Sequence, residues 1–158
     1  MIQMIKATDM ELELVITIRV EMLKVVNCLS EDAVFDKAFF DTTREYFKNA
    51  HQTTVLAIDN GEAIGCATIC YIYVMPTVDH PSGKRAHIMN VYIRNSHRRQ
   101  GLAFEMMKML IEEATQKGVT EISLDATEAG RPLYEKCGFV PAQEGMVLCI
   151  NPKLSCTH

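Results

Sequence analysis

The sequence of 158 residues lacks the features of several protein classes. No apolar run is long enough to cross a bilayer, and the residues after Met1 lack the basic and then apolar order of a signal peptide. We therefore expect a cytoplasmic protein with no membrane partner. The formal net charge is -4, so the basic footprint of a nucleic-acid binder is also missing. We expect no nucleic-acid partner.

Cysteine patterns typical of disulfide or metal sites are absent as well. The six cysteines form no C-x-x-C pair and show no regular spacing. Their apolar surroundings favour reduced, mostly buried thiols over a disulfide framework. We expect no bound metal.

Length and composition indicate one globular domain over residues 1–158. Apolar residues make up 48% of the chain and charged residues 23%, which is typical of a protein that buries a core without covalent staples. No repeat, low-complexity tract or linker divides the chain.

The first half predicts a strand, two helices and an antiparallel strand pair. Thr8 and Glu11 form a capping box, and the apolar residues that follow are spaced by three and four, as in an amphipathic helix. The segment Asp59-Asn60-Gly61-Glu62 predicts a hairpin turn. The expected elements are strands at 2–6, 53–58 and 63–75, with helices at 12–26 and 36–49.

The second half predicts a crossover between parallel strands. A helix at 101–117 separates strands at 85–93 and 120–126, so these strands should run parallel in one sheet. A short helix at 128–136 follows. Phe139–Val140 and Met146–Ile150 predict a final strand pair, whose exposed edge would permit a homodimer. The fold class expected is therefore α+β, with a mixed, mostly antiparallel central sheet flanked by helices.

The segment that follows the strand at 85–93 has the composition of an anion site. A polar and basic loop leads into a helix that begins at Gly101. The first N–H groups of a helix lack partners within the helix and attract negative charge, and a glycine lets an anion approach them. Arg98 and Arg99 would add positive charge.

These residues carry a family resemblance. Arg98-x-x-Gly101-x-Ala103, which follows a strand ending in Val91-Tyr92-Ile93, resembles the acyl-CoA pyrophosphate signature of the GNAT superfamily of N-acetyltransferases. Short glycine patterns recur by chance, so this motif alone is weak.

A second motif strengthens the resemblance. Tyr134-x-x-x-Gly138-Phe139 resembles the tyrosine and glycine-phenylalanine pair of the same superfamily's second conserved block. The two motifs occur in the family's order and in the right strand and helix contexts. The resemblance implies a central sheet splayed open between the parallel strands at 85–93 and 120–126.

The resemblance also implies acetyl-CoA as the co-substrate and assigns residues to it. The backbone of Val91, Tyr92 and Ile93 would bind the pantetheine arm and the thioester carbonyl. Thr127 stands where many members carry an asparagine that contacts the pantetheine. The pyrophosphate would lie against Arg98, Arg99, Gln100, Gly101, Leu102 and Ala103.

Tyr134 is the candidate catalytic acid. A positioned phenol can donate a proton to the thiolate that leaves as the amine attacks; the alternative is a ring that only packs. The general base stays open between His87, Glu21, Glu45 and ordered water. For His87, a half-exposed strand position is the alternative to catalysis.

The acceptor site is the least specified part. Arg19 falls on the apolar stripe of the first helix, so it either snorkels to the edge or faces a polar cavity, where it and Glu21 would grip a substrate. Asn90 is an uncommon polar residue in an apolar strand, with a structural or a pocket-lining role. We expect the pocket to form from 19–23, the second helix, the loop at 76–84 and the last strands.

These observations predict transfer of an acetyl group from acetyl-CoA to a primary amine by direct attack, with a small-molecule amine favoured over a protein amine. The alternative is a non-catalytic acyl-CoA binder of the same fold. A cationic amine and an amino acid both remain open as acceptors. Arg19, if it faces the cavity, would favour an acceptor with a carboxylate. A generic nucleotide-binding protein would need a glycine-rich loop directly after the first strand, and that loop is absent.

Overall fold

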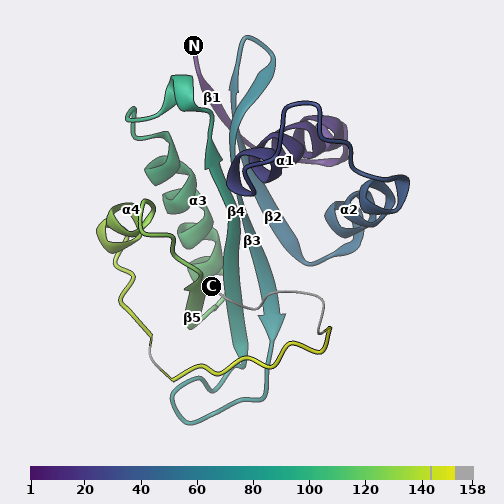
Figure 1. Ribbon diagram of the computed structural model, residues 1–158. Coiled ribbons are helices and arrows are strands. Elements are labelled where there is room, and N and C mark those ends of the chain that lie inside the picture. The colour runs from purple at the N-terminus through teal and green to yellow at the C-terminus, as the bar shows by residue number, and fades with distance from the viewer. Residues whose placement is uncertain (143, 152–158) are drawn as a thin grey trace.

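The computed structural model describes residues 1–142 and 144–151 (Figure 1). The helices and strands are β1 (Gln3–Lys6), α1 (Leu12–Val26), α2 (Lys37–Asn49), β2 (Gln52–Asp59), β3 (Glu62–Tyr73), β4 (Lys84–Ile93), α3 (Leu102–Gln116), β5 (Glu121–Leu124) and α4 (Arg131–Lys136). Single turns of 3-10 helix lie at Asp9–Glu11 and Asn95–His97. The elements predicted up to residue 136 are present, with small shifts of their ends.

The strands form one mixed sheet in the order β1-β2-β3-β4-β5. Neighbouring strands are antiparallel from β1 to β4, and β4 pairs with β5 in parallel. This arrangement confirms the predicted mixed sheet and its parallel crossover. The pairing of β4 with β3 shifts register between Cys66 and Thr68, which marks a β-bulge in β4 at Asn90 and Val91, opposite Ala67.

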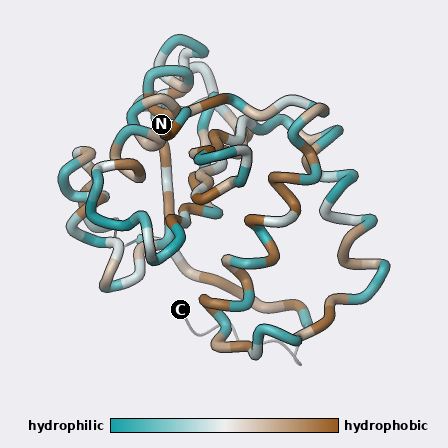
Figure 2. The backbone as a smooth tube through the Cα atoms, turned by 90° about the horizontal axis from the view of Figure 1, so that it is seen from above, coloured by the Kyte–Doolittle hydropathy of each residue, from teal (hydrophilic) through white to brown (hydrophobic). Residues whose placement is uncertain are grey.

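Helices cover both faces of the sheet. Figure 1 shows α3 and α4 on one side and α1 and α2 on the other, and Figure 2 shows hydropathy alternating along the chain. Met106 and Leu110 of α3 pack on one face in the larger buried cluster. Ile18 of α1 packs with Leu56 and Tyr92 on the other face. Among the described helices, none is long and apolar enough to cross a membrane.

Helix starts follow the capping expected from the sequence. The Thr8 hydroxyl accepts a hydrogen bond from the Met10 N–H, and the Glu11 carboxylate accepts one from the Thr8 N–H, which completes the predicted capping box. Asp36 caps α2 by accepting a hydrogen bond from the Phe39 N–H at 2.8 Å. The first cap starts the 3-10 turn Asp9–Glu11 that leads into α1, and the second starts α2.

The predicted final strand pair is wrong. Neither Phe139–Val140 nor Met146–Ile150 forms a strand in the described part of the chain. Pro141 cannot donate to a strand ladder, and the side chains of Val140, Met146 and Leu148 are exposed, so no burial supports pairing. In the described part of the chain, the edge proposed for a homodimer is therefore not formed and β5 is the last strand.

The cysteines agree in part with the expectation of reduced thiols. Cys66 is a buried free thiol, Cys70 and Cys137 are half-buried, and Cys28 is exposed. Cys149 is disulfide-bonded, so the expectation is wrong for this residue.

Candidate active site

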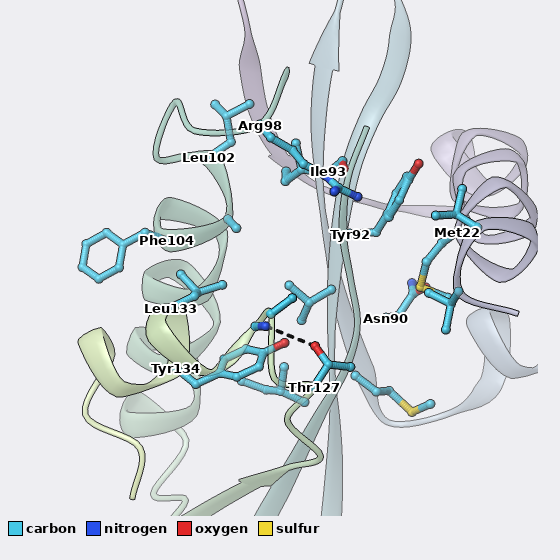
Figure 3. Close-up of a pocket in the computed structure, with 18 of the residues that line it drawn as sticks. Met22, Asn90, Tyr92, Ile93, Arg98, Leu102, Phe104, Thr127, Leu133 and Tyr134 are labelled. Carbon is cyan, nitrogen blue, oxygen red and sulfur yellow. Dashed lines mark hydrogen bonds between the residues drawn. The ribbon is translucent and has the colours of Figure 1, made fainter. Parts of the chain in front are cut away.

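The parallel strands separate after a short stretch of pairing. β5 pairs with β4 only along Arg85–Ile88, whereas β4 continues to Ile93. The separation opens a cavity of about 680 Å³ between β4, the start of α3 and α4 (Figure 3). The predicted donor-site residues that line it are Val91, Tyr92, Ile93, Arg98, Arg99, Gly101, Leu102, Ala103 and Thr127, together with Tyr134. Gln100 does not line it.

Hydrogen bonds show which way the exposed edge of β4 faces. The Arg94 N–H donates to the Ile64 carbonyl of β3 at 2.8 Å. Backbone polar groups alternate along a strand, so those of Val91 and Ile93 face away from β3. The Ile93 carbonyl accepts a hydrogen bond from Arg98 Nε at 3.0 Å, in agreement with this phase. The edge at Val91 is therefore open toward the cavity, as an extended ligand would need.

The loop before α3 presents backbone N–H groups. Gly101 is the N-cap of α3 with φ +77°, in the left-handed region that glycine favours, and Arg99 has φ +61°. A Cβ built on Gly101 would meet nothing within 4 Å, so the backbone angle rather than crowding calls for glycine. Left-handed residues before a helix turn successive N–H groups toward one concave site, which suits an anion.

Tyr134 reaches from α4 toward β4 (Figure 3). Its ring is half-buried and meets Phe139 edge-on, with 6.2 Å between ring centroids. Burial, aided by the nearby Cys137, raises the pKa of the Tyr134 hydroxyl above its ordinary value of 10.0. The phenol therefore stays protonated and can act as a proton donor.

Thr127 supports the start of α4. Its hydroxyl accepts a hydrogen bond from the Gly130 N–H at 3.1 Å, and its carbonyl accepts one from the Arg131 N–H at 3.0 Å. Its hydroxyl proton is still available to a ligand, because the hydroxyl acts only as an acceptor in this contact. Thr127 thus both stabilises the start of α4 and lines the cavity.

A second cavity, of about 450 Å³, lies on the α1 and α2 side of the sheet. Its lining residues are Arg19, Thr43, Tyr46, Phe47, Thr68, Cys70, Ile72, His87, Met89 and Asn90. Arg19 and α2 contribute as the sequence predicted for the acceptor pocket, whereas the loop at 76–84 does not. The lining residues Thr68, Cys70 and Ile72 of β3 were missed, because apolar or small side chains in a strand carry no signal that separates pocket from core.

Asn90 lies at the bulge where the two cavities meet. Its φ of +61° is left-handed, which asparagine tolerates better than most residues. Its amide accepts a hydrogen bond from Arg19 Nη1 at 3.1 Å and donates one to Thr68 Oγ1 at 3.2 Å. Burial raises the pKa of Cys66 to about 12, so this thiol stays protonated and donates to the Asn90 carbonyl. Asn90 is therefore both a structural residue and a lining residue.

Arg19 lines the second cavity instead of reaching bulk solvent from its edge. It is half-buried, and burial lowers the pKa of its guanidinium below the ordinary value. Asn90, its hydrogen-bond partner, is neutral. Of the two interpretations left open by the sequence, the structure supports the cavity.

Glu21 lines neither cavity. Its carboxylate accepts hydrogen bonds from Arg94 Nε at 3.0 Å and Nη2 at 2.9 Å, and from the Tyr92 hydroxyl at 3.1 Å. The Arg94 hydrogen bonds hold the pKa of Glu21 below its ordinary value. The structure therefore does not bring Glu21 together with Arg19 and Asn90.

His87 lines both cavities. Its Nδ1 lies 2.8 Å from Ser123 Oγ on β5, and its Nε2 lies 3.9 Å from Asp125 Oδ2. These contacts hold the imidazole ring where the first and second cavities adjoin. Glu45, also weighed as a base, lines neither cavity.

The comparisons with known proteins agree with this geometry. The mixed five-stranded sheet flanked by helices matches solved structures of acetyltransferases. Residues 20–139 match the acetyltransferase (GNAT) family. The chain therefore belongs to the GNAT family of acetyltransferases.

Two crystal structures are similar to this protein over nearly its whole chain. A predicted acetyltransferase from Clostridium acetobutylicum, solved with acetyl-CoA, has a TM-score of 0.82 and 27% identity, and the match covers 95% of this chain and 97% of that one. A GCN5-related N-acetyltransferase from Ralstonia eutropha has a TM-score of 0.77 and 25% identity, with coverage of 96% and 100%. Acetyl-CoA is thus the co-substrate supported by both family and fold.

Similar curated proteins are N-acetyltransferases. A probable glucosamine 6-phosphate N-acetyltransferase 2 from rice is 34% identical over 68 residues, or 43% of this chain and 40% of that protein. The rat N-acetyltransferase family 8 member 2 is 26% identical over 119 residues, or 73% and 47%. The chain thus spans less than half of these two proteins. Glucosamine 6-phosphate N-acetyltransferase 1 of Dictyostelium discoideum is 28% identical over 135 residues, or 80% and 84%.

Proposed function

We propose that this protein transfers an acetyl group from acetyl-CoA to the primary amine of a small molecule by direct attack. The observation that carries the proposal is that three functional parts line one cavity, the first one described above. The open edge of β4, the first turn of α3 and the Tyr134 ring all line the space where β4 leaves β5. A strand edge, an anion site and a proton donor are the three parts that a thioester donor requires.

The donor would lie along this cavity. Val91, Tyr92 and Ile93 present strand backbone that can hydrogen-bond the amide groups of the pantetheine arm and polarise the thioester carbonyl. The loop N–H groups from Arg99 to Ala103, with the charge of Arg98, suit the pyrophosphate. Thr127 would offer its hydroxyl proton to the pantetheine from the opposite wall.

The reaction would proceed at the junction of the two cavities. The neutral amine forms a bond to the thioester carbon, and backbone N–H groups of β4 stabilise the oxyanion. As the carbon–sulfur bond breaks, Tyr134 donates its hydroxyl proton to the departing thiolate. The amine nitrogen loses one proton, which leaves the amide as product.

His87 is the base that we propose for this last proton. Of the bases considered from the sequence, Glu21 is bound to Arg94 and Glu45 lines neither cavity. The imidazole adjoins both cavities and is oriented through Nδ1 by Ser123. A histidine held in this way can accept a proton directly or through one water.

We also propose that residues 1–158 act as one acyltransferase domain, because α1 and α3 pack against the single sheet and α2 packs against α1. The direct test of function is to supply acetyl-CoA with a panel of amines and follow release of the CoA thiol. Acetyl-CoA consumption that depends on an amine supports the enzyme. Binding of acetyl-CoA without turnover on any amine would support the alternative, a non-catalytic acyl-CoA binder.

A further inference from the structure

The second cavity has an unusual distribution of charge. Among its lining residues Arg19 is the permanent cation, and no aspartate or glutamate joins it. Its other polar side chains include those of Thr43, Thr68 and Asn90 and the Tyr46 hydroxyl, which lies 2.7 Å from the Cys70 thiol. The side chains of Phe47, Ile72 and Met89 make the rest of the wall apolar. This cavity therefore offers one positive charge in an apolar setting.

Arg19 differs from Arg44, Arg85 and Arg94 in having no acidic partner among the described residues. Arg94 pairs with Glu21, and Arg44 pairs with Glu13. In the described part of the chain Arg19 forms no ion pair, and its guanidinium donates to the neutral Asn90 side chain. A half-buried guanidinium loses hydration, and an anion placed against it would restore much of that lost free energy. The remaining donors of Arg19 are thus available to a ligand.

We propose that the acceptor is an amine that also carries a carboxylate, bound by Arg19, and an apolar side chain, packed against Phe47 and Met89. This proposal rests on the proposed acetyl transfer, because it names the acceptor of that reaction. The guanidinium matches a carboxylate through paired N–H donors. An amino acid with an aliphatic, thioether or aromatic side chain fits both features.

The charge count separates this acceptor from two others. A polyamine or an aminoglycoside carries several positive charges, which Arg19 would repel, and the cavity supplies no carboxylate to bind them. A sugar phosphate carries nearly two negative charges and hydroxyl groups. One guanidinium between apolar walls balances the single charge of a carboxylate better. A carboxylate is therefore the anion that the cavity favours.

Because the two cavities adjoin, an acceptor bound in the second cavity would lie next to acetyl-CoA in the first. His87, Met89 and Asn90 line both cavities, and Asn90 hydrogen-bonds Arg19. A carboxylate on Arg19 would leave the amine directed along β4 toward His87 and the thioester. The amine and the carboxylate of one small molecule would thus meet the two polar ends of the cavity.

The first test compares acceptors in pairs at saturating acetyl-CoA. L-methionine, L-leucine and L-phenylalanine are each compared with the amine that lacks the carboxylate, for example 2-phenylethylamine for phenylalanine. We expect kcat/KM to be about 10- to 100-fold higher for the member with the carboxylate. Arg19→Gln should remove this preference, mainly by raising KM for the amino acid. Arg44→Gln is the matched control, because Arg44 lies outside both cavities, and should keep the preference.

Asn90→Asp gives a second variant that retains the polar group at the bulge. A carboxylate at this position would neutralise Arg19 in place, so it should also abolish the preference for carboxylate acceptors while acetyl-CoA still binds. Faster turnover of glucosamine 6-phosphate, spermidine or the decarboxylated amines by the wild type would overturn the proposal. So would a carboxylate preference that survives Arg19→Gln.

Binding measurements separate this inference from the proposed function. Calorimetry with acetyl-CoA alone tests the donor site. Calorimetry with L-phenylalanine in the presence of CoA tests the carboxylate site without turnover, and we expect weaker binding to Arg19→Gln than to the wild type. Equal binding, or none to either protein, contradicts the carboxylate site even if acetyl-CoA is consumed with other amines. If the wild type does not bind acetyl-CoA, the proposed function is contradicted, whatever the result for the carboxylate site.

Discussion

Gly130 lies directly beneath the ring of Tyr134. A Cβ built at Gly130 would lie 2.9 Å from Cε2 of Tyr134 and 3.2 Å from Oγ1 of Thr127. The φ of Gly130 is -83°, an angle that any residue adopts. The glycine is therefore needed for the space that the ring occupies and not for its backbone angle.

Gly130→Ala should lower kcat without unfolding the protein. The added methyl group would push the Tyr134 hydroxyl from its place, and a displacement near 1 Å is worth roughly 100-fold in rate. Stability should change little, because alanine fits the backbone angle. Steady-state kinetics and thermal unfolding check both parts. Gly145→Ala, where a Cβ meets nothing within 4 Å, is the control and should leave kcat unchanged.

Gly101→Ala should affect acetyl-CoA binding as well as stability. Alanine at φ +77° costs about 1–2 kcal/mol, and relief of that strain would reorient the loop N–H groups. We expect a higher KM for acetyl-CoA. Gly61→Ala is a matched control, because Gly61 has φ +81°, open space around it and a place in the β2–β3 turn, away from both cavities. If both variants raise the KM for acetyl-CoA equally, the loop before α3 does not bind acetyl-CoA.

Glu21→Gln should lower the free energy of unfolding by an amount that depends on pH. The pKa of Glu21 is depressed below 4.5, chiefly by hydrogen bonds from Arg94, so the stabilisation is complete well above that pH and is lost as pH falls through the folded pKa. We expect a loss of about 2 kcal/mol in the free energy of unfolding at pH 7, which shrinks as pH is lowered through 4.5. Urea unfolding at several pH values measures it.

The matched control for Glu21 is Glu13→Gln, which removes an exposed ion pair with Arg44 and should change stability little. A contact between Glu21 and the acceptor would show a different pattern. The acceptor KM would then rise in Glu21→Gln while the free energy of unfolding stayed the same, and the structural account of Glu21 would be wrong.

His87→Gln should lower kcat by about 100-fold while the KM for acetyl-CoA stays nearly constant, because glutamine can hydrogen-bond Ser123 but cannot accept the proton. His80→Gln provides a close control. His80 also contacts a hydroxyl, that of Thr120 at 2.8 Å, and a carboxylate, that of Glu121 at 3.2 Å, but lines neither cavity. Equal loss of activity in the two variants would argue that His87 has only a structural role.

Local patterns were sufficient for most of the fold. The capping box at Thr8 and the Asn60-Gly61 turn act through neighbouring residues, and the alternation of buried and exposed positions follows from the strand or helix period. The final strands failed because pairing depends on partners and burial elsewhere. Met146–Ile150 is apolar enough for a strand, yet its side chains are exposed and it has no strand beside it in the described residues.

The candidate site divides in the same way. The donor residues were predictable because they lie on one strand and the loop after it. Arg19 was ambiguous because its orientation depends on Asn90, 71 residues away, and Glu21 depends on Arg94, 73 residues away. Positions two apart on a helix face different directions, so the sequence neighbours Arg19 and Glu21 reach different surroundings. No local pattern contains that information.

The turnover number of Tyr134→Phe is the most direct test of acetyl transfer at this site. Phenylalanine keeps the ring over Gly130 and removes only the hydroxyl proton that the departing thiolate would receive. With acetyl-CoA and an amine that the wild type acetylates, we expect kcat to fall by about 100-fold or more while acetyl-CoA binding is retained. An unchanged kcat would contradict the assignment of Tyr134 as the acid.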